Sequence, residues 1–229
     1  MNILSIGKEI QFNQLHITSI AFSDVDKIQN LEDYDYLIIS GGDGSIRRTV
    51  QQLLTLNVTL PPFIINATGS FNVIAKIHKT PKLEMILASL SNQEIPQTKK
   101  QKIYKLNNEI FLFSAGNMGD LQHIFLSETL RFGLLQKGMM KYILSALFLF
   151  PVHLIMTPFM LMSKTRFFIF TPFYFIQKFG SFYGKVEEIY IDLHNHHNHL
   201  QLDGDIVTIE ENVIVIKLLG NIDIIVQSK

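Results

Sequence analysis

The chain has 229 residues, which is enough for one large domain or two small ones. Its 20 basic and 20 acidic residues cancel, so the net charge gives no support to a nucleic-acid partner. The lack of cysteine excludes disulfides, thiolate metal sites and cysteine nucleophiles. Apolar residues make up 47% of the sequence, which indicates an unusually apolar surface or groove. Lys8 and Glu9 interrupt the first apolar run too early for a signal peptide, so a cytosolic protein is expected.

The N-terminal part of the chain alternates apolar runs with helical patterns. The runs, each typical of a buried strand, cover residues 3–6, 17–22, 36–40 and 63–66. Apolar residues at helical spacing follow the last two runs, from Ile46 to Leu54 and from Val73 to Ile77. A third helix is expected to start at Thr80-Pro81, with a capping residue and a first-turn proline. This alternation predicts an α/β domain with a parallel sheet over residues 1–95.

After the polar segment 91–102, which we interpret as a linker, the pattern changes to strands. A β-hairpin is predicted around Asn107-Asn108, between residues 103–106 and 110–113. Gly220-Asn221 is a good hairpin turn and is expected to join the last two strands of the chain. The later strands are expected near residues 186–193, 199–203, 206–209, 213–219 and 222–226. Residues 96–229 are therefore predicted to form a second, mostly antiparallel β domain.

Residues 139–176 form an apolar, helical insertion within this second domain. No formal charge occurs from Tyr142 to Ser163, and the length would permit a membrane span. Pro151 and Pro158, however, break helical continuity. Basic residues flank the segment, as they do beside anionic lipid, at Lys137, Lys141, Lys164 and Arg166. Three interpretations stay open: a buried helix pair, a segment that lies at the membrane interface, and a true span.

The first candidate site is the glycine turn Gly41-Gly42-Asp43-Gly44-Ser45. It follows the apolar run 36–40 and opens a helical stretch. Such a strand, turn and helix start lets the backbone approach polyphosphate closely, while Asp43 can hold a metal ion or orient a hydroxyl. Glycine turns also occur for steric reasons alone, so this motif is only moderately specific.

A second small-residue turn, Gly69-Ser70-Phe71-Asn72, follows the run 63–66 and precedes another helical pattern. Ser70 and Asn72 have side chains that hydrogen-bond phosphate or ribose, and equally ones that cap an ordinary helix. Two such turns at successive strand ends of one parallel sheet would face the same crevice, where α/β sheets bind ligands.

Two polar stretches near the C-terminus are further candidates. Leu202-Asp203-Gly204-Asp205 lies between two β segments and offers two carboxylates, although Asp-Gly alone favours a plain hairpin turn. The stretch His194–His199 contains four histidines, a density that can bind zinc, nickel or copper. Its place between two predicted strands favours a polar loop instead.

Taken in order along the chain, these motifs resemble the diacylglycerol kinase catalytic domain. The resemblance is carried by Gly41–Ser45, by Gly69–Lys76, by Asn117-Met118-Gly119 and by Leu202–Asp205, and it is strongest to bacterial lipid kinases of the YegS and BmrU types. It implies a nucleotide-binding α/β domain followed by a β-rich domain. It also implies transfer of the γ-phosphate of ATP to a lipid hydroxyl, with magnesium.

The resemblance assigns roles to individual residues. Asp203 and Asp205 occupy the two acidic positions of the family's late motif, which supplies a general base. Asp43 matches the acidic residue of the glycine motif and is the candidate ligand for Mg²⁺. Phosphoryl transfer needs little beyond positioning, charge neutralisation and a carboxylate near the attacking hydroxyl. Contacts with ATP are implied for Gly41, Gly42, Asp43, Gly44, Ser45, Gly69 and Ser70, with Asn72 supporting the second turn.

Several features depart from the family pattern. Arg47 and Arg48 follow the glycines where an acidic residue is usual. Cations in the first turn of a helix oppose its dipole unless an anion offsets them, so these arginines either bind phosphate or are simply solvated. Asp205 replaces a glutamate and is one methylene shorter. The Asn-Pro-x-Ser-Gly-like turn that precedes the glycine motif in relatives is missing.

The sequence therefore predicts an ATP-dependent kinase that acts on diacylglycerol or a similar lipid, cytoplasmic and peripheral at the membrane surface. No nucleic-acid partner is expected, and a homo-oligomer is compatible with the sequence. One alternative is a catalytically degenerate relative that binds lipid or membrane, as Arg48 and the missing first turn would suggest. Another is an enzyme like NAD kinase, which shares a Gly-Gly-Asp-Gly turn but fits Gly69–Lys76 less well.

Overall fold

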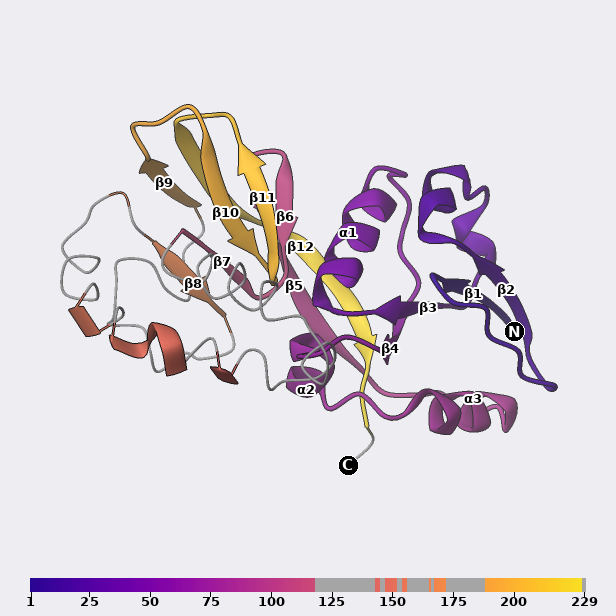
Figure 1. Cartoon of the computed structure of the whole chain (residues 1–229). Helices are drawn as coiled ribbons and strands as arrows, with labels where there is room; N and C mark the ends of the chain where they lie inside the picture. Colours follow the sequence, from indigo (N-terminus) through magenta and orange to yellow (C-terminus); the bar gives the residue numbers. More distant parts are fainter. Residues whose placement is uncertain are drawn as a thin grey trace. The chain divides into compact units, whose positions relative to one another are not determined.

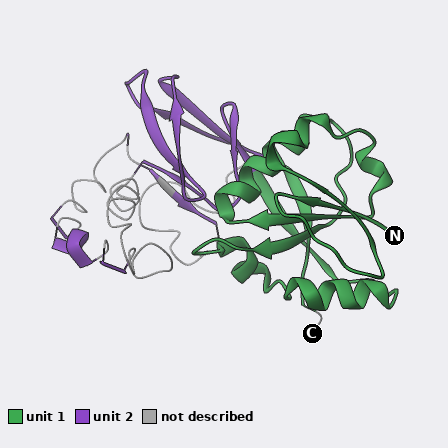
Figure 2. Cartoon of the chain, turned by 45° about the vertical axis from the view of Figure 1, so that its right-hand side comes forward, with its two compact units in different colours: residues 1–103, 220–229 green, residues 104–219 purple. Residues whose placement is uncertain are grey.

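The computed structural model describes residues 1–117, 143–144, 147–151, 154–155, 165, 167–171 and 188–227. The chain divides into two compact units (Figure 2). Unit 1 consists of residues 1–103 and 220–229, and unit 2 of residues 104–219. The division thus lies later than the predicted boundary between residues 95 and 96, and the C-terminal residues return to unit 1.

Unit 1 is built on a parallel sheet. Its first four strands match the four predicted apolar runs: β1 (Asn2–Ile6), β2 (His16–Ile20), β3 (Tyr36–Gly41) and β4 (Phe63–Ala67). They lie in the order β2-β1-β3-β4, and each neighbouring pair is parallel. The last strand of the chain, β12 (Val213–Ile225), adds a parallel neighbour to β4, with Ile224 opposite Phe63. The carboxyl ends of β1, β3 and β4 therefore share one edge of the sheet.

Helices cover both faces of this sheet, as Figure 1 shows for α1 and α3. α1 (Asp43–Leu54) packs on β3 and on the 3-10 helix η1 (Phe22–Lys27), and α3 (Leu83–Ser91) packs on β4. The short elements η2 (Leu31–Asp33) and α2 (Val73–His78) complete the unit. Alternate residues of a strand point to opposite faces, so the runs supply apolar side chains to both layers. The α3 face buries Ile3, Ile38, Ile64, Ile86, Leu87, Leu90 and Ile225.

The third helix starts later than predicted. Thr80 and Pro81 precede it, Lys82 is its N-cap residue in an extended conformation, and Leu83 is its first residue. The reason lies in the end of α2. The N–H of Thr80 donates to the carbonyl of Ala75 at 3.0 Å, so Thr80 closes the preceding helix instead of opening the next one.

Unit 2 is antiparallel, as the sequence predicted. The β5 (Thr98–Leu106) and β6 (Glu109–Phe111) hairpin turns at Asn107, whose φ is 50°, and β9 (Glu188–Asp192) pairs with the start of β12. A second sheet has the order β11-β10-β7-β8. Its strands are β7 (Ser114–Gly116), β8 (Phe168–Phe170), β10 (Asn198–Leu202) and β11 (Asp205–Ile209). Side chains from both sheets form one buried cluster, including Leu106, Phe111, Phe167, Ile191, Leu200, Leu202 and Ile216.

Two predictions for the connections are wrong. The interpreted linker 91–102 is partly strand, because β5 already begins at Thr98. Gly220-Asn221 is no hairpin turn, because β12 runs unbroken from Val213 to Ile225. A two-residue hairpin turn of the common type needs positive φ at both residues, and neither Gly220 nor Asn221 has it. The strand therefore continues from unit 2 into unit 1.

The apolar segment 139–176 lies mostly outside the described residues. Of it, the structure describes 143–144, 147–151, 154–155, 165 and 167–171, so the three interpretations of this segment stay predictions. Within the part of the chain that the structure describes, no helix combines the length and the apolar character that crossing a membrane requires.

Candidate functional site: two abutting glycine turns and an Asp-Gly-Asp hairpin turn

The two predicted glycine turns pack directly against each other at the carboxyl ends of β3 and β4. The N–H of Thr68 donates to the carbonyl of Gly41 at 3.1 Å. A Cβ atom added at Gly69 would lie 2.6 Å from Cα of Gly42, and one added at Gly42 would lie 3.2 Å from Cα of Gly69. Real Cβ atoms essentially never have a contact as short as the 2.6 Å at position 69, so only glycine fits there. The glycines bring two backbones together.

Asp43 joins the first turn to the second. Its carboxylate accepts the N–H of Val73 at 2.8 Å and that of Ile74 at 3.0 Å, so it caps α2 from a different element. The side chain is buried, with 8% of the residue exposed. Burial raises the pKa of this carboxyl, while the two N–H donors and the charge of Lys76 act in the opposite direction. Asp43 is therefore a positioning group for both turns.

Asn72 holds the second turn closed. It has a left-handed backbone, with φ of 50°, which asparagine tolerates better than most residues. Its Oδ1 accepts the N–H of Gly69 at 2.9 Å, and its Nδ2 donates to the carbonyl of Gly69 at 2.7 Å. Ser70 lies exposed at the tip of this turn. The support that the sequence assigned to Asn72 is thus present as two hydrogen bonds.

The start of α1 forms the other wall of the first turn. Gly42 is the N-cap residue, and the first N–H groups of an α-helix have no partner within it. Such a terminus attracts anions. The two arginines that follow differ: Arg48 is exposed, whereas Arg47 is 3% exposed and donates from Nη1 to Oε1 of Gln51 at 3.5 Å. Arg47 is therefore not a solvated surface arginine, and its role in binding phosphate stays a prediction.

A third glycine turn, which the sequence analysis missed, follows β1. Gly7 has φ of 93°, and its N–H donates to the carbonyl of Ile20 at 2.9 Å. The Asn-Pro-x-Ser-Gly pattern is absent, yet a turn occupies the end of the first strand. A glycine directly after the run 3–6 was the available signal. Beside this turn lies a cavity of about 490 Å³, lined by Gly7, Lys8, Glu9, Ile10, Gln11, Ile17, Ser19, Ile20 and Ala21.

In unit 2, Asp203 is a structural anchor. Asp203 and Gly204 have φ of 50° and 92° and form the two-residue turn between β10 and β11. The residue is 1% exposed. Its carboxylate accepts three backbone N–H groups that follow β6 and reach the first residue of β7, from Leu112 at 2.6 Å, Phe113 at 2.9 Å and Ser114 at 2.8 Å.

Asp205 has a different environment from Asp203. It is the first residue of β11, stands opposite Leu202 in the hairpin, and is half-buried. The turn at Asp203-Gly204 separates the two carboxylates into different surroundings, although they are two residues apart in the sequence. Asp203 lies inside the unit and Asp205 is partly accessible to solvent.

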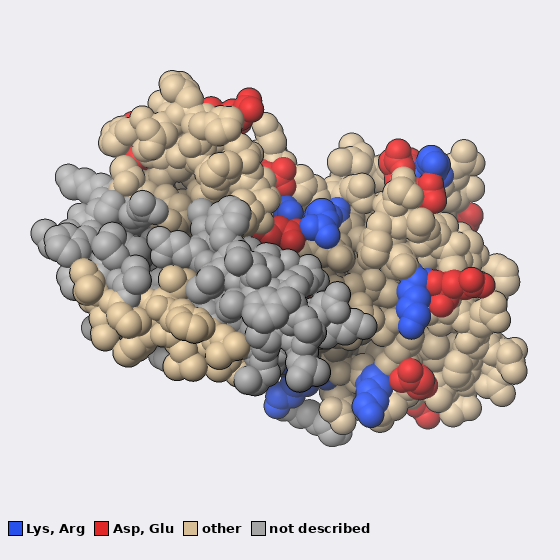
Figure 3. Space-filling model, in the orientation of Figure 1, with Lys and Arg blue, Asp and Glu red and all other residues tan. Residues whose placement is uncertain are grey.

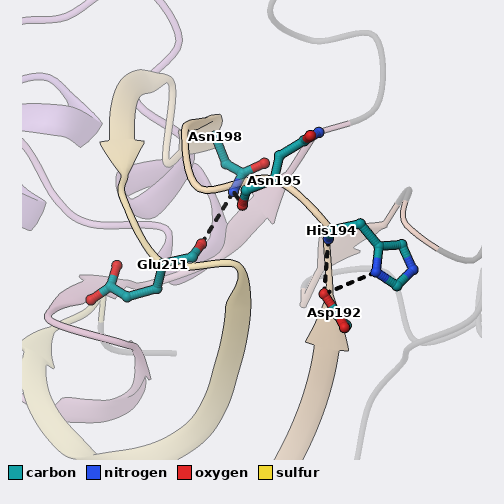
Figure 4. Close-up of polar contacts among 5 residues, drawn as sticks. All are labelled: Asp192, His194, Asn195, Asn198 and Glu211. Carbon is teal, nitrogen blue, oxygen red and sulfur yellow. Dashed lines mark hydrogen bonds and ion pairs between the residues drawn. The ribbon is translucent and has the colours of Figure 1, made fainter.

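The histidine-rich stretch is a polar loop between β9 and β10 as far as His197, as the sequence favoured, and its last two residues open β10 (Figure 4). Oδ1 of Asp192 accepts the backbone N–H of His194 at 2.8 Å and lies 3.2 Å from its Nδ1. Nδ2 of Asn198 donates to the carbonyls of Asn195 at 2.7 Å and Glu211 at 3.1 Å. Among the described residues, no three histidine, aspartate or glutamate side chains gather closely enough to hold a metal ion.

The parallel α/β unit with its abutting glycine turns, followed by an antiparallel β unit, has the two-domain fold of the diacylglycerol kinase type. Residues 11–103 match the sequence model of the diacylglycerol kinase catalytic domain, which confirms the resemblance over the segment that carries both turns. This segment is thus similar in sequence to that catalytic domain.

Solved structures agree on the fold over nearly the whole chain. Two are described as "a putative diacylglycerol kinase" from Bacillus anthracis str. Sterne. The first has a TM-score of 0.60 and 14% identity and covers 99% of this chain and 96% of its own. The second has a TM-score of 0.59 and 13% identity and covers 99% and 95%. At such identities the likeness concerns the fold. None of the curated proteins matches this chain significantly.

Proposed function

We propose that this protein is an ATP-dependent lipid kinase that transfers a phosphoryl group to the hydroxyl of diacylglycerol or a similar lipid. The observation that carries the proposal is the match of residues 11–103 to the diacylglycerol kinase catalytic domain, because this segment contains both glycine turns. The two turns abut at the carboxyl edge of a parallel sheet, and α/β folds bind nucleotides at this edge.

Unit 1 is the proposed nucleotide-binding unit. The N–H groups at the start of α1 favour an anion at the first glycine turn. Arg47, in the same helix, is proposed to add a positive charge. Gly41, Gly42, Gly44, Ser45, Gly69 and Ser70 would supply backbone and hydroxyl contacts to the phosphates. The cavity of about 490 Å³ beside Gly7 lies at the ends of β1 and β2, and its size suits a nucleoside.

Asp205 is the proposed general base, and it would accept the proton of the attacking lipid hydroxyl. The three N–H groups bound to Asp203 argue for this division of roles. A carboxylate that already accepts three hydrogen bonds is stabilised as an anion and is a poorer base. Asp203 would instead hold the hairpin that carries Asp205.

The described residues do not by themselves form a magnesium site. Both oxygens of Asp43 accept backbone N–H groups, and no cluster of three acidic or histidine side chains occurs among the described residues. Mg²⁺ is commonly bound through substrate phosphates with few protein ligands. The proposed use of Mg²⁺ therefore needs few ligands from this chain. The role of Asp43 that we propose is to position the two turns.

The acceptor is proposed to be presented at a membrane surface. Six large apolar side chains of the described part of 139–176 are between 46% and 66% exposed: Ile143, Leu147, Phe148, Phe150, Leu154 and Ile155. Exposed apolar patches of this kind mark surfaces for lipid or protein contact. Insertion of such side chains into the bilayer interface would bring a lipid hydroxyl within reach of a water-soluble enzyme. On the face drawn in Figure 3, acidic and basic side chains lie interspersed among the described residues.

The test is transfer of label from γ-labelled ATP to a panel of lipids in mixed micelles, with and without magnesium. We expect a labelled lipid phosphate from the wild type and at least a thousandfold slower transfer from Asp205→Asn, about the effect of losing a catalytic base. His194→Asn, in the exposed loop, is the control variant. Failure of every lipid to accept label would overturn the proposal, as would full activity of Asp205→Asn.

A catalytically degenerate lipid-binding relative is the second candidate, favoured by the engaged oxygens of Asp43 and Asp203. Thermal unfolding with ATP and magnesium separates the two, since a ligand of the native state raises its stability. A shift with ATP but no transfer would support the degenerate relative. No shift would exclude nucleotide binding.

A further inference from the structure

Unit 1 contains a second cavity of about 490 Å³ that the proposed phosphoryl transfer does not use. It lies between the end of β4, helix α2 and the segment that leads into α3. Three lysines line it, Lys76, Lys79 and Lys82, against one acidic residue of the described lining, Glu84. Asn66, Asn72 and Thr80 add polar groups, and Ile65, Ala67, Ala75, Pro81 and Leu83 form apolar walls.

The fold, rather than the sequence order alone, gathers these lysines. Lys76 lies in the last turn of α2, and Lys79 directly follows the last residue of that helix, His78. Lys79 then adopts a left-handed backbone with φ of 50°, which ends the helix and turns the chain toward Lys82. The turn is fixed by the N–H of Gln227, which donates to the carbonyl of Lys79 at 3.3 Å. The backbone that carries Lys79 is therefore held by unit 1, while the side chains of all three lysines are exposed.

We propose that this pocket binds a phosphate group, carried either by a small phosphorylated molecule or by the headgroup of an anionic lipid. Three exposed lysines line one cavity, and their positive charges would attract a phosphate. Lysine binds phosphate as a point charge with three donors, and the neighbouring amide and hydroxyl groups add hydrogen bonds. The volume would hold a phosphate together with a small organic group.

A phosphate bound in the pocket is expected to affect the glycine turns through two residues, Asn72 and Lys76. Asn72 lines the cavity and holds Gly69 by two hydrogen bonds. Lys76 lines it as well, and its charge lowers the pKa of Asp43, opposing the effect of burial. An anion beside Lys76 would weaken that influence. The pocket is thus placed to modulate the first turn without belonging to it.

The first test compares inorganic phosphate with chloride at matched ionic strength, using thermal unfolding of the whole protein. Phosphate should raise the unfolding temperature of the wild type, whereas the double variant Lys79→Gln/Lys82→Gln should bind phosphate at least about tenfold more weakly. Lys100→Gln/Lys102→Gln, which removes two exposed charges of β5, is the matched control and should respond like the wild type. Equal responses of all three proteins would overturn the proposal.

The second test distinguishes the source of the phosphate. Co-sedimentation is measured with vesicles of phosphatidylcholine alone and with added phosphatidic acid. Loss of the preference for phosphatidic acid in Lys79→Gln/Lys82→Gln, with the control unchanged, supports a lipid headgroup. An unchanged preference together with a lost phosphate effect supports a soluble ligand.

ATP titration of the same variants separates this pocket from the nucleotide site. ATP binding retained by Lys79→Gln/Lys82→Gln supports a distinct site, and its loss would overturn that assignment. If neither the wild type nor the variants bind ATP, the kinase proposal fails. The phosphate experiment still decides whether the pocket binds phosphate.

Discussion

The backbones of Gly42 and Gly69 lie so close that a Cβ atom at position 69 would stand 2.6 Å from Cα of Gly42. We expect Gly69→Ala to destabilise the protein by about 2 kcal/mol or more and to weaken ATP binding, because the two turns must separate. Gly220→Ala is the control, since a Cβ there meets nothing within 4 Å. Urea denaturation measures the stability difference. Similar stability of the two variants would contradict the close approach.

Asp43 is expected to matter for stability as well as for activity. Asp43→Ala leaves the N–H groups of Val73 and Ile74 without their carboxylate, and we expect a loss of about 2–4 kcal/mol. Asp24→Ala, which breaks the exposed pair with Lys27, should cost less than about 1 kcal/mol. Equilibrium unfolding of both variants checks this. An Asp43→Ala protein of wild-type stability would mean that the carboxylate does not hold the turns together.

Substitutions of the two aspartates of the late motif, Asp203 and Asp205, should differ in their effect on the stability of the protein. Asp203→Asn removes the charge that accepts three backbone N–H groups, so a loss of about 3 kcal/mol is expected. Asp205→Asn should change the stability by less than about 1 kcal/mol while abolishing phosphate transfer. The opposite pattern, a stable Asp203→Asn and an unfolded Asp205→Asn, would reverse the roles.

His78 should make unit 1 sensitive to acid. The residue is 4% exposed, and its Nε2 lies 2.8 Å from Oε1 of Gln101. Burial lowers the pKa of this imidazole from its ordinary value of 6.5, and Lys99 adds to the effect. Between pH 6.5 and the lower pKa of the folded state, the unfolded chain binds a proton at His78 that the folded chain does not bind. The stability of the protein is therefore full above pH 6.5 and is lost as the pH falls to the folded pKa.

The corresponding experiment compares His78→Gln with the wild type by denaturation on both sides of pH 6.5. The variant should show a smaller loss of stability on acidification, because glutamine stays neutral. His16→Gln, at an exposed position, should keep the wild-type dependence. A pH dependence that is identical in His78→Gln and the wild type would exclude His78 as its source.

Membrane contact through the exposed apolar residues can be tested by vesicle binding. Leu147→Ser/Phe148→Ser should reduce partitioning by roughly a hundredfold, if each side chain contributes about 1.5 kcal/mol on insertion. Leu218→Ser/Leu219→Ser is a matched control, since these leucines are 45% and 47% exposed on β12. Equal loss in both variants would indicate a general response to lower surface hydrophobicity.

Local patterns were enough to predict most elements of the fold. Apolar runs gave the four strands of unit 1, because a buried parallel strand is apolar on both faces. Helical spacing gave α1, and Asn107-Asn108 gave the β5–β6 hairpin. The errors came from turn signals that tertiary contacts overrule. Gly220-Asn221 stays extended within β12, and Thr80 is used by the end of α2.

By itself, the sequence determined the order of the motifs and the two-domain class, since these depend on composition and spacing along the chain. Only the tertiary structure decided what the acidic residues do. Asp43 meets Val73 across 30 positions, and Asp203 meets Leu112 across 91, and no local pattern encodes such pairs. Backbone N–H groups at a helix start or a strand break have no partner within the helix or sheet, so they need another acceptor when they are buried. The carboxylates of Asp43 and Asp203 are these acceptors. The same folding left Asp205 as the carboxylate of the late motif that is partly open to solvent.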